Sequence, residues 1–451
     1  MPRARTLISK ALYLCEPSEN QERRLGAVAE EIKGLVDKYV AQLDDVVDVV
    51  FGGSFAKGTW LPDDADIDIF VKIKPSVGIE KFEEMGREIG SETLKKYGPK
   101  LRYSDHPYVE AFVKKVRVNI VPCYDVEQGK WKSAADRSPF HTRYISIRYD
   151  DQKRGQARLL KKFFKSLGIY GAEVSTAGFS GYVSEVLVLK YCSFENVLRT
   201  AADWQERQVI ALGDYDSDFV KGFNSPVTII DPVDSRRNLG TAISPESVAK
   251  FILAARAFLE RPSLQFFKES KRHSAASKLL LRNVLVVEFS HQRKSPDIIW
   301  GQLKRSINSI EKQLELAHFA VLRSSCLTDE RSSAALVFLL ESIILPPYMK
   351  KKGPQIFRRK DTASFLSNRK RRPLAIWVDR EMRIAMLVDR KAIDARKLVR
   401  SLLLNDAEKS GISRDLIVNK LRIYSGNDRK IKGLVKEAVG KVVSTEHLIF
   451  R

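Results

Sequence analysis

The sequence predicts a multidomain protein of mixed α/β and α+β architecture, and three observations support this. The chain has 451 residues, which is too long for one ordinary domain. Helical and strand patterns alternate up to about residue 145, helical patterns dominate from 146 to 262, and both kinds mix again afterwards. We therefore expect an α/β sheet domain at 1–145, a helical domain at 146–262, an α+β domain at 263–372 and a basic C-terminal region at 373–451.

The elements of the first domain follow from capping residues and from hydrophobic periodicity. Ser18 and Gln21 form a capping-box pattern before apolar residues at helical spacing, which predicts a helix that ends near Leu43. The dipeptide Gly52-Gly53 predicts a tight turn after a strand. Short apolar or alternating runs predict four strands, at 46–51, 66–73, 108–113 and 117–121.

The same kinds of signal continue along the chain. A helix is predicted at 158–167, where Gly168 suits the C-terminal cap. Another is predicted to start at Ser244-Pro245 and to end near Glu260, because serine favours the N-cap and proline the first helical position. Later patterns predict two strands and one helix, at 283–289, 334–340 and 300–316.

Charge and composition narrow the possible classes of function. Lysine and arginine outnumber aspartate and glutamate by 78 to 56, so the formal net charge of +22 predicts a polyanionic partner. No apolar run approaches the roughly 18–20 residues that span a bilayer, and no signal-peptide cleavage site is evident, so we expect a cytoplasmic protein without a membrane segment. The four cysteines form no C-x-x-C pair, which argues against a zinc site or a disulfide framework.

The residues with the clearest chemistry lie in the first domain, in the segment GGSFAKGTW (52–60). Two glycines after a strand let the backbone approach a bulky anion, and the amides of the following turn can bind a phosphate. Ser54 adds a hydroxyl donor, and Lys57 adds a positive charge about one helical turn later. This pattern indicates a phosphate site, although a plain turn between two strands would also fit these residues.

Two carboxylates follow about twelve residues later, in the predicted strand that begins D-I-D. Asp66 and Asp68 project from the same face because side chains alternate along a strand. Adjacent carboxylates repel each other, and a divalent cation with oxygen ligands such as Mg²⁺ relieves that repulsion. A solvated edge strand is the structural alternative, but the two motifs in this order indicate metal-assisted phosphoryl or nucleotidyl transfer.

These motifs carry a family resemblance. The segments GGSFAKGTW and DADIDIF resemble the signature of the DNA polymerase β-like nucleotidyltransferase superfamily. The chain resembles the archaeal, class I CCA-adding enzymes in particular, over nearly its full length. Seven further stretches carry this likeness, at 106–126, 133–145, 157–174, 178–191, 231–242, 261–267 and 353–357.

The resemblance implies a nucleotidyltransferase head, a helical neck, an α+β body and a basic tail, which correspond to the four predicted domains. It implies template-independent addition of C, C and A to tRNA from CTP and ATP, two Mg²⁺ ions and a homodimer. Asp66 and Asp68 would be metal ligands. The nucleotide contacts that it implies are Ser54, Lys57, His141, Lys161, Tyr170 and Arg237.

Four of these implied nucleotide contacts could instead have a purely structural role. His141 could cap a turn, Lys161 lies among basic residues that are typical of a solvated helix face, and Tyr170 could pack in a core. Arg237 could pair with Asp231 or Asp234. The family usually has arginine at the position of Lys57. Lysine keeps the positive charge but lacks the planar guanidinium group that can donate two parallel hydrogen bonds.

Asn119 is the main departure from the family pattern. The VPCY motif is usually preceded by an aspartate, the third metal carboxylate, whereas this chain reads Val118-Asn119-Ile120. Asparagine offers an amide oxygen to a metal but no charge. Three interpretations stay open: weaker metal binding with activity kept, substitution by Glu110 or Asp125, or loss of activity.

The basic stretch after residue 349 is expected to bind tRNA. Between residues 349 and 400 the chain has 17 lysines and arginines against 5 acids, in what we expect to be a loop-rich segment. Clustered cations bind RNA phosphates without regard to sequence, although a solvated loop is the structural alternative. The expected RNA contacts are Lys350, Lys351, Lys352, Arg358, Arg359, Arg369, Arg371 and Arg372.

Two other functions compete with CCA addition. A poly(A)- or oligo(U)-adding polymerase of the same superfamily would share the head chemistry, and only the length of its product would distinguish it. A decayed, non-catalytic tRNA-binding protein is the second alternative, and Asn119 is the feature that supports it.

Overall fold

The computed structural model describes residues 2–103, 107–268, 278–367, 373–405, 416–417, 419–428 and 431–450. The chain forms two compact units. The first comprises Met1–Lys271 together with Glu446–Arg451, and the second comprises Arg272–Thr445. No helix of the described residues is long and apolar enough to cross a membrane.

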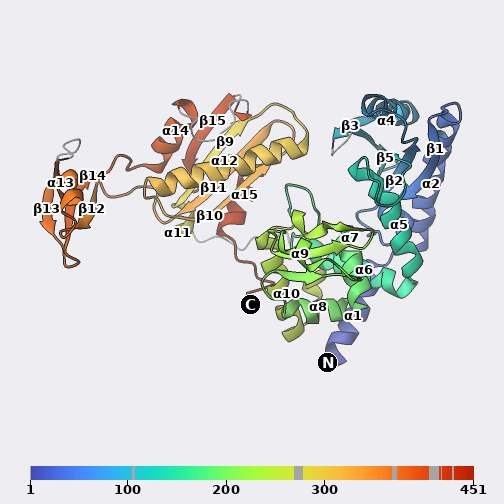
Figure 1. Ribbon diagram of the computed structural model, residues 1–451, viewed down its shortest axis with the longest axis horizontal. Coiled ribbons are helices and arrows are strands. Elements are labelled where there is room, and N and C mark those ends of the chain that lie inside the picture. Colours follow the sequence, from blue (N-terminus) through green and yellow to red (C-terminus); the bar gives the residue numbers. More distant parts are fainter. Residues whose placement is uncertain are drawn as a thin grey trace. The chain divides into compact units, whose positions relative to one another are not determined.

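A five-stranded sheet forms the head of the first unit, with the strand order β1-β2-β5-β4-β3 (Figure 1). Strands β1 (Val46–Gly52) and β2 (Asp66–Ile73) are antiparallel, whereas β2 and β5 (Val116–Tyr124) are parallel. Strands β4 (Pro107–Val113) and β3 (Lys100–Tyr103) continue the sheet in antiparallel fashion. The four strands expected from the sequence are therefore confirmed, and β3 is an additional edge strand.

Two helices cover one face of this sheet. Helix α2 (Glu19–Val40) begins with the predicted capping box between Ser18 and Gln21, and α4 (Ile79–Thr93) lies beside it. Their apolar residues pack with Ile67, Ile69, Val118 and Ile120 of the central strands. The alternating residues of the same strands therefore project from the opposite face, where α3 (Gly53–Lys57) and α5 (Arg137–Arg148) lie.

The neck is a bundle of helices around an aromatic core. Helix α6 (Asp151–Ser166) contacts α7 (Gly181–Tyr191) and α8 (Phe194–Ala202), and α8 packs on α10 (Pro245–Glu260). Helix α1 (Pro2–Cys15) packs on α6, so the first residues of the chain join the neck rather than the head sheet. The core contains Phe163, Phe164, Phe179, Phe194, Phe251 and Phe258.

The neck also contains a small sheet that the helical expectation did not include. Strands β6 (Gln208–Ile210), β7 (Val227–Asp231) and β8 (Asp234–Asn238) form it, and α9 (Ser217–Lys221) lies between β6 and β7 in sequence. Among its described residues the first unit also has short 3₁₀ helices at Lys95–Tyr97, Ala134–Asp136, Leu239–Ala242 and Leu264–Phe267.

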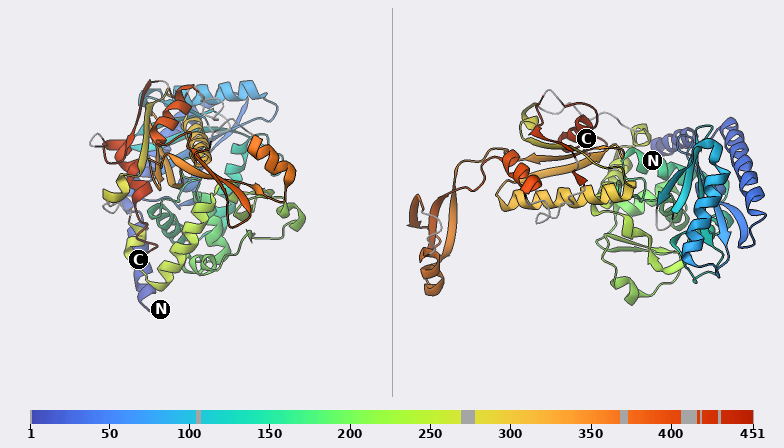
Figure 2. Two further views of the ribbon diagram at one scale, coloured as in Figure 1. Left: turned by 90° about the vertical axis from the view of Figure 1, so that its left-hand side faces the viewer. Right: turned by 90° about the horizontal axis from the view of Figure 1, so that it is seen from above.

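The second unit is built on a four-stranded antiparallel sheet with the order β10-β11-β9-β15 (Figures 1 and 2). Its helices α12 and α15 pack on this sheet, and α14 contacts α12 and β15. The bounds of these elements are β9 Val284–Ser290, β10 Val321–Thr328, β11 Ser333–Leu340, β15 Asn419–Ser425, α11 Lys278–Leu281, α12 Pro296–Leu316, α14 Ala395–Asn405 and α15 Gly433–Val443.

A separate three-stranded sheet contains the basic stretch. Its order is β12 (Tyr348–Gln355), β14 (Arg383–Asp389) and β13 (Ala375–Val378), and α13 (Arg359–Ser367) packs on β12. The expectation of a loop-rich segment was wrong here. Strand β12 has the sequence YMKKKGPQ, which lacks the β-branched residues that signal a strand, and its pairing with β14 supplies the order.

Candidate active site

The open face of the head sheet carries a row of polar side chains across three strands. Asp68 of β2 is paired in register with Asn119 of β5, which is paired in turn with Glu110 of β4. A second row places Asp66 beside Arg117. Because directly paired residues project from the same face, the two predicted metal carboxylates and Asn119 meet on this surface.

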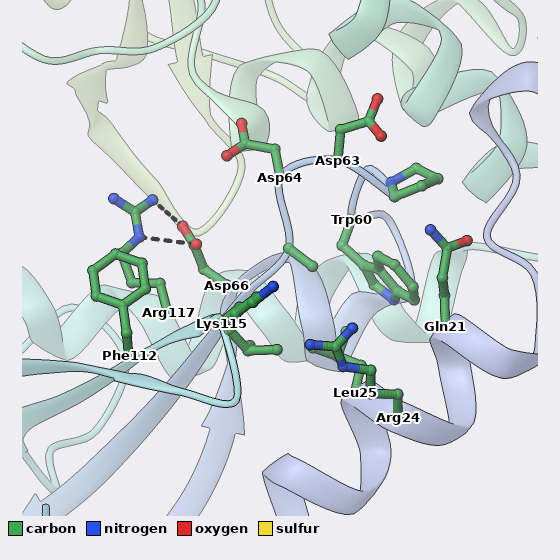
Figure 3. Close-up of a pocket in the computed structure, with 13 residues that line it drawn as sticks. Gln21, Arg24, Leu25, Trp60, Asp63, Asp64, Asp66, Phe112, Lys115 and Arg117 are labelled. Atoms are coloured by element: carbon green, nitrogen blue, oxygen red, sulfur yellow. Dashed lines mark hydrogen bonds and ion pairs between the residues drawn. The ribbon is translucent and has the colours of Figure 1, made fainter. Parts of the chain in front are cut away.

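Each of these carboxylates has a partner within the protein. The Arg117 guanidinium donates to both carboxylate oxygens of Asp66, with 2.9 Å between Nε and Oδ1 (Figure 3). The Asn119 amide Nδ2 donates to Asp68 Oδ1 at 2.8 Å. Burial raises the pKa of the Asp66 carboxyl, and the Arg117 ion pair opposes that rise. The repulsion between the two aspartates is therefore reduced by a cation on one side and an amide on the other.

A divalent cation fits this set of oxygen atoms. Asn119 Oδ1 is buried and has no hydrogen-bond partner among the described residues. Because Nδ2 is the amide atom that faces Asp68, the oxygen could reach a hard cation such as Mg²⁺ there only after the amide turns. Within the described residues no group of three or more His, Cys, Asp or Glu side chains is placed to hold a metal ion.

The two carboxylates considered as substitutes for Asn119 differ in position. Glu110 is buried, lies directly beside Asn119 in register, and is held by Arg102 at 2.8 Å. Asp125 lies six residues further along the chain, roughly 20 Å away at 3.3 Å per residue, and pairs with Lys72. Asp125 is thus too distant, and Glu110 is the carboxylate that stands next to Asn119.

A cavity of about 430 Å³ opens beside Asp66. Helix α2, the loop before β2 and the hairpin between β4 and β5 form its walls, and Figure 3 shows the Arg117 guanidinium facing the Asp66 carboxylate. Aromatic side chains of Trp60 and Phe112 also line it. Asp66 and Arg117, at the starts of β2 and β5, therefore border this cavity.

Contacts within the protein require glycine at both positions of the Gly52-Gly53 pair. A Cβ atom on Gly52 would lie 2.3 Å from the Phe70 ring, and one on Gly53 would lie 1.9 Å from Asp68 Oδ2. Gly53 also has a φ of +64°, which favours glycine. The backbone at Gly53 thus lies very close to the Asp68 carboxylate, and only glycine leaves room for it. Ser54, the next residue of α3, therefore lies near Asp68 as well.

Lys57 and Lys161 meet in the interior of the head–neck junction on a third residue, Glu185 of α7. Lys57 Nζ donates to Glu185 Oε2 at 2.5 Å, and Lys161 Nζ donates to Oε1 at 2.8 Å. Thr59 Oγ1 also donates to Oε1, at 2.5 Å. The side chains of Lys57, Lys161 and Glu185 are 6%, 1% and 0% exposed. The structural alternative for Lys161, a position on a solvated helix face, is therefore excluded.

We call Lys57, Lys161, Glu185 and Thr59 the lysine cluster. The charges within it affect the pKa values of Lys161 and Glu185. Burial lowers the pKa of Lys161 to about 8, Glu185 opposes this, and Lys57 adds to it. Burial alone would raise the pKa of Glu185, but Lys161 and Lys57 outweigh it and lower that pKa to about 2. At neutral pH the carboxylate is therefore ionised. Tyr170 adjoins the cluster, because a Cβ on Gly181 would lie 3.1 Å from its Oη and 3.5 Å from Lys161 Nζ.

His141 and Arg237 meet on a second buried carboxylate, Asp231. His141 Nε2 lies 2.8 Å from Asp231 Oδ2, Arg237 donates to the same oxygen at 3.3 Å, and Tyr182 donates to Oδ1 at 3.2 Å. Burial lowers the pKa of His141, so the ring is neutral at pH 7. Because a carboxylate only accepts hydrogen bonds, Nε2 carries the proton and Nδ1 is left as an acceptor.

Tyr182 connects the two buried groups. Its ring stacks on His141 with the ring centroids 3.9 Å apart, and Lys57 Nζ lies 5.4 Å from the centroid of the same ring. The structure therefore brings five of the six predicted nucleotide contacts to one region of the head–neck junction, and Ser54 lies one helical turn before Lys57 on α3.

Comparison with known protein families agrees with this geometry. A nucleotidyltransferase domain model matches residues 34–144, and the model of the tRNA nucleotidyltransferase second domain matches residues 155–268. The model of the CCA-adding enzyme C-terminal domain matches residues 282–426. The chain belongs to the CCA-adding enzyme family. The resemblance to a nucleotidyltransferase head followed by family-specific domains is confirmed.

Curated relatives cover most of the chain. The CCA-adding enzyme of Pyrobaculum aerophilum is 38% identical over 364 residues, which are 78% of this chain and 82% of that enzyme. The CCA-adding enzyme of Saccharolobus shibatae is 34% identical over 87% of this chain and 90% of its own length. A solved structure of a cytoplasmic RNA terminal U-transferase aligns at 15% identity and a TM-score of 0.48, over 60% of this chain and 100% of that chain.

The predicted RNA contacts of this CCA-adding enzyme lie on and after strand β12. Lys350, Lys351 and Lys352 are exposed, but Lys350 pairs with Asp379 at 3.2 Å and Lys352 with Glu381 at 2.9 Å. Arg358 and Arg359 are exposed at the start of α13. The other three predicted contacts, Arg369, Arg371 and Arg372, lie outside the described residues.

Two buried carboxylates, Glu185 and Asp231, organise the predicted contacts. The sequence offered Asp231 as a partner of Arg237, and the structure confirms that pair, whereas Glu185 was not predicted. A signal for Glu185 exists, because it is an acid inside the otherwise apolar helix GYVSEVLVLKY. Buried acids are almost always paired, so this residue predicted basic partners, although it did not say which ones.

Proposed function

We propose that this enzyme adds the terminal C, C and A to the 3′ end of tRNA from CTP and ATP, without a template and with release of pyrophosphate. The observation that carries the proposal is the meeting of Asp66, Asp68 and Asn119 on one open sheet face, beside the turn that bears Ser54 and Lys57. Family membership supports the same activity.

We propose that two Mg²⁺ ions bind at this face of the sheet. Their protein ligands would be Asp66, Asp68 and the amide oxygen of Asn119. Bound there, the metal lowers the pKa of the RNA 3′-hydroxyl and neutralises charge on the triphosphate. Asp66 must exchange its Arg117 ion pair to take part, and Asn119 must turn its oxygen toward the metal. The 3′-oxygen attacks the α-phosphorus in line, the bond to the bridging oxygen breaks, and pyrophosphate leaves.

The other site residues would bind and orient the nucleotide. Ser54 and Lys57 would contact the triphosphate, and His141 would offer its neutral Nδ1 as an acceptor. Lys161 Nζ already has three acceptors, so it contacts a phosphate only by exchanging one of them. Tyr170 would approach the nucleotide from the neck. Arg237, held by Asp231, would present the rest of its guanidinium to the base.

The partners follow from the same proposal. The exposed cations of β12 and α13 would bind the tRNA backbone, since phosphate contacts accept many sequences. A homodimer is implied by the family resemblance, and a cytoplasmic location would match the tRNA substrate.

One reaction tests the proposal. Purified protein is incubated with Mg²⁺, a tRNA transcript without CCA, and labelled CTP and ATP, and the products are resolved at single-nucleotide resolution. We expect growth by three nucleotides that requires both CTP and ATP. A long tail of one nucleotide would assign the enzyme to the tailing polymerases, and tRNA binding without incorporation would favour the decayed, non-catalytic protein.

A further inference from the structure

We infer that Glu185 is a positioning residue for triphosphate binding and that it acts through the Lys57 ammonium. This rests on the proposed function, in which Lys57 contacts the triphosphate. Glu185 lies on α7 of the neck, whereas Lys57 ends α3 of the head, 128 residues earlier in the sequence. The carboxylate therefore joins the catalytic domain to the neck at the side chain that would meet the phosphate.

Hydrogen-bond capacity distinguishes the two lysines of the cluster. An ammonium group has three donors. Lys161 Nζ uses all three, on the Thr59 carbonyl at 3.0 Å, on Thr59 Oγ1 at 2.9 Å and on Glu185 Oε1 at 2.8 Å. Among the described residues Lys57 Nζ makes one hydrogen bond, to Glu185 Oε2, so it retains two donors for a ligand.

The remaining contacts of Glu185 explain how it fixes Lys57. Its Oε1 is held by Thr59 and Lys161, so the carboxylate itself cannot rotate freely. Oε2 is thereby aimed at Lys57 Nζ. A long lysine side chain loses much rotamer freedom when it is held, and this arrangement removes that freedom before the nucleotide binds.

Positioning and direct electrostatics predict opposite effects of Glu185. A carboxylate next to a phosphate site repels the phosphate, so its neutralisation should tighten binding if charge alone matters. If the carboxylate positions Lys57, its neutralisation should weaken binding, because the ammonium is no longer aimed. The sign of the change therefore separates the two roles.

The test is a double-mutant cycle of the full-length protein with inorganic tripolyphosphate as the probe. Four proteins are compared by calorimetry: wild type, Glu185→Gln, Lys57→Met and the double variant. We expect both single changes to weaken binding, by about threefold or more for Glu185→Gln and about tenfold for Lys57→Met. In the Lys57→Met background we expect Glu185→Gln to cause no further loss, because its effect passes through Lys57.

Controls separate this inference from folding and from the proposed function. Glu195→Gln removes a carboxylate from an ion pair with Arg199 on α8 of the same neck, so its tripolyphosphate affinity should equal that of the wild type. Thermal unfolding checks each variant. If Glu185→Gln alone fails to fold, Glu185→Gln with Lys161→Met, which removes one charge of each sign, replaces it and is compared with Lys161→Met alone.

Three results would overturn the inference: unchanged or tighter binding by Glu185→Gln, unchanged binding by Lys57→Met, or equal losses from Glu185→Gln with and without Lys57. The wild-type enzyme is assayed for three-nucleotide addition in parallel. Failure of that assay would refute the proposed function itself, whereas an active wild type with an unaffected Glu185→Gln would refute only the role of Glu185.

Discussion

Two regions of the molecule each bring like charges close together. They are the carboxylate face of the head sheet, with Asp66 and Asp68, and the lysine cluster of the head–neck junction, with Lys57 and Lys161. In each, two like charges are brought together and a third group relieves their repulsion. Arg117 pairs with Asp66 at an edge open to a cavity, whereas Glu185 pairs with Lys57 and Lys161 in the interior. The difference in burial decides whether the partner can be exchanged.

This difference has a physical reason. Arg117 is 42% exposed, so water replaces its contacts when it leaves Asp66, and a metal can take its place at modest cost. Glu185 is fully buried, and its removal would leave Lys57 and Lys161 without a counter-charge in a medium of low dielectric. The carboxylate face is therefore suited to bind a metal reversibly, while the lysine cluster is a permanent part of the fold.

The largest expected effect concerns the metal ligands. Asp68→Ala should lower nucleotide incorporation by at least about a thousandfold, because a metal worth several kcal/mol would be lost and each ~1.4 kcal/mol is a factor of ten. Single-turnover incorporation measures this, and circular dichroism should show an unchanged fold. Asp37→Ala, in an exposed ion pair with Lys33, is the matched control. Turnover by Asp68→Ala close to that of the control would refute the metal assignment.

The next effect tests the permanence of the lysine cluster. Glu185→Gln should lower the free energy of unfolding at pH 7 by about 3 kcal/mol, because two buried cations lose their counter-charge. Denaturant titration measures this, and Glu195→Gln should stay within about 0.5 kcal/mol of the wild type. If Glu185→Gln were as stable as the control, the Glu185 ion pairs would contribute little to the free energy of unfolding. The proposed difference between the lysine cluster and the carboxylate face would then be wrong.

The same contribution should depend on pH with a defined sign. The pKa of Glu185 is lowered from 4.5 to about 2 in the folded protein, so its stabilisation is complete above pH 4.5 and is lost as the pH falls toward 2. The difference in unfolding free energy between the wild type and Glu185→Gln should therefore narrow between pH 4.5 and pH 2. A difference that stays constant over this window would contradict the assigned ion pairs.

The next prediction concerns the metal affinity of the carboxylate face, which Asn119→Asp should change. A third carboxylate in the row should increase Mn²⁺ affinity by on the order of tenfold, because it adds a full negative charge beside the cation. Electron paramagnetic resonance measures free Mn²⁺ directly, without reference to activity. Asn119→Ala, which removes the amide oxygen, should weaken the affinity. If neither change alters it, Asn119 is not a ligand and Glu110 becomes the next residue to vary.

The smallest effect concerns Arg117. Arg117→Gln should lower the Mg²⁺ concentration for half-maximal activity by up to about fivefold, because a partly exposed ion pair is worth about 1 kcal/mol or less. Arg24→Gln, on another wall of the same cavity, is the control. A higher Mg²⁺ requirement in Arg117→Gln would show that the arginine supports the metal site instead of competing for it.

Local patterns predicted seven elements of the first unit, because each depends on residues close together in sequence. These elements are α2, β1, β2, β4, β5, α6 and α10. The capping box at Ser18, the paired aspartates of β2 and the Gly52-Gly53 turn are of this kind. Two features of the second unit gave no such signal. Strand β15 pairs with β9 from about 130 residues away, and β12 has a composition unlike a strand.

The sequence by itself determined the family and the projection of Asp66 and Asp68 from one face of their strand. The tertiary structure alone decided that Lys57 and Lys161 share the Glu185 carboxylate, and that His141 and Arg237 share Asp231. A strand's alternation is a property of neighbouring residues, so it can be read locally. The pairing of buried charges depends instead on which helices pack together, because only burial removes the water that would otherwise solvate each charge.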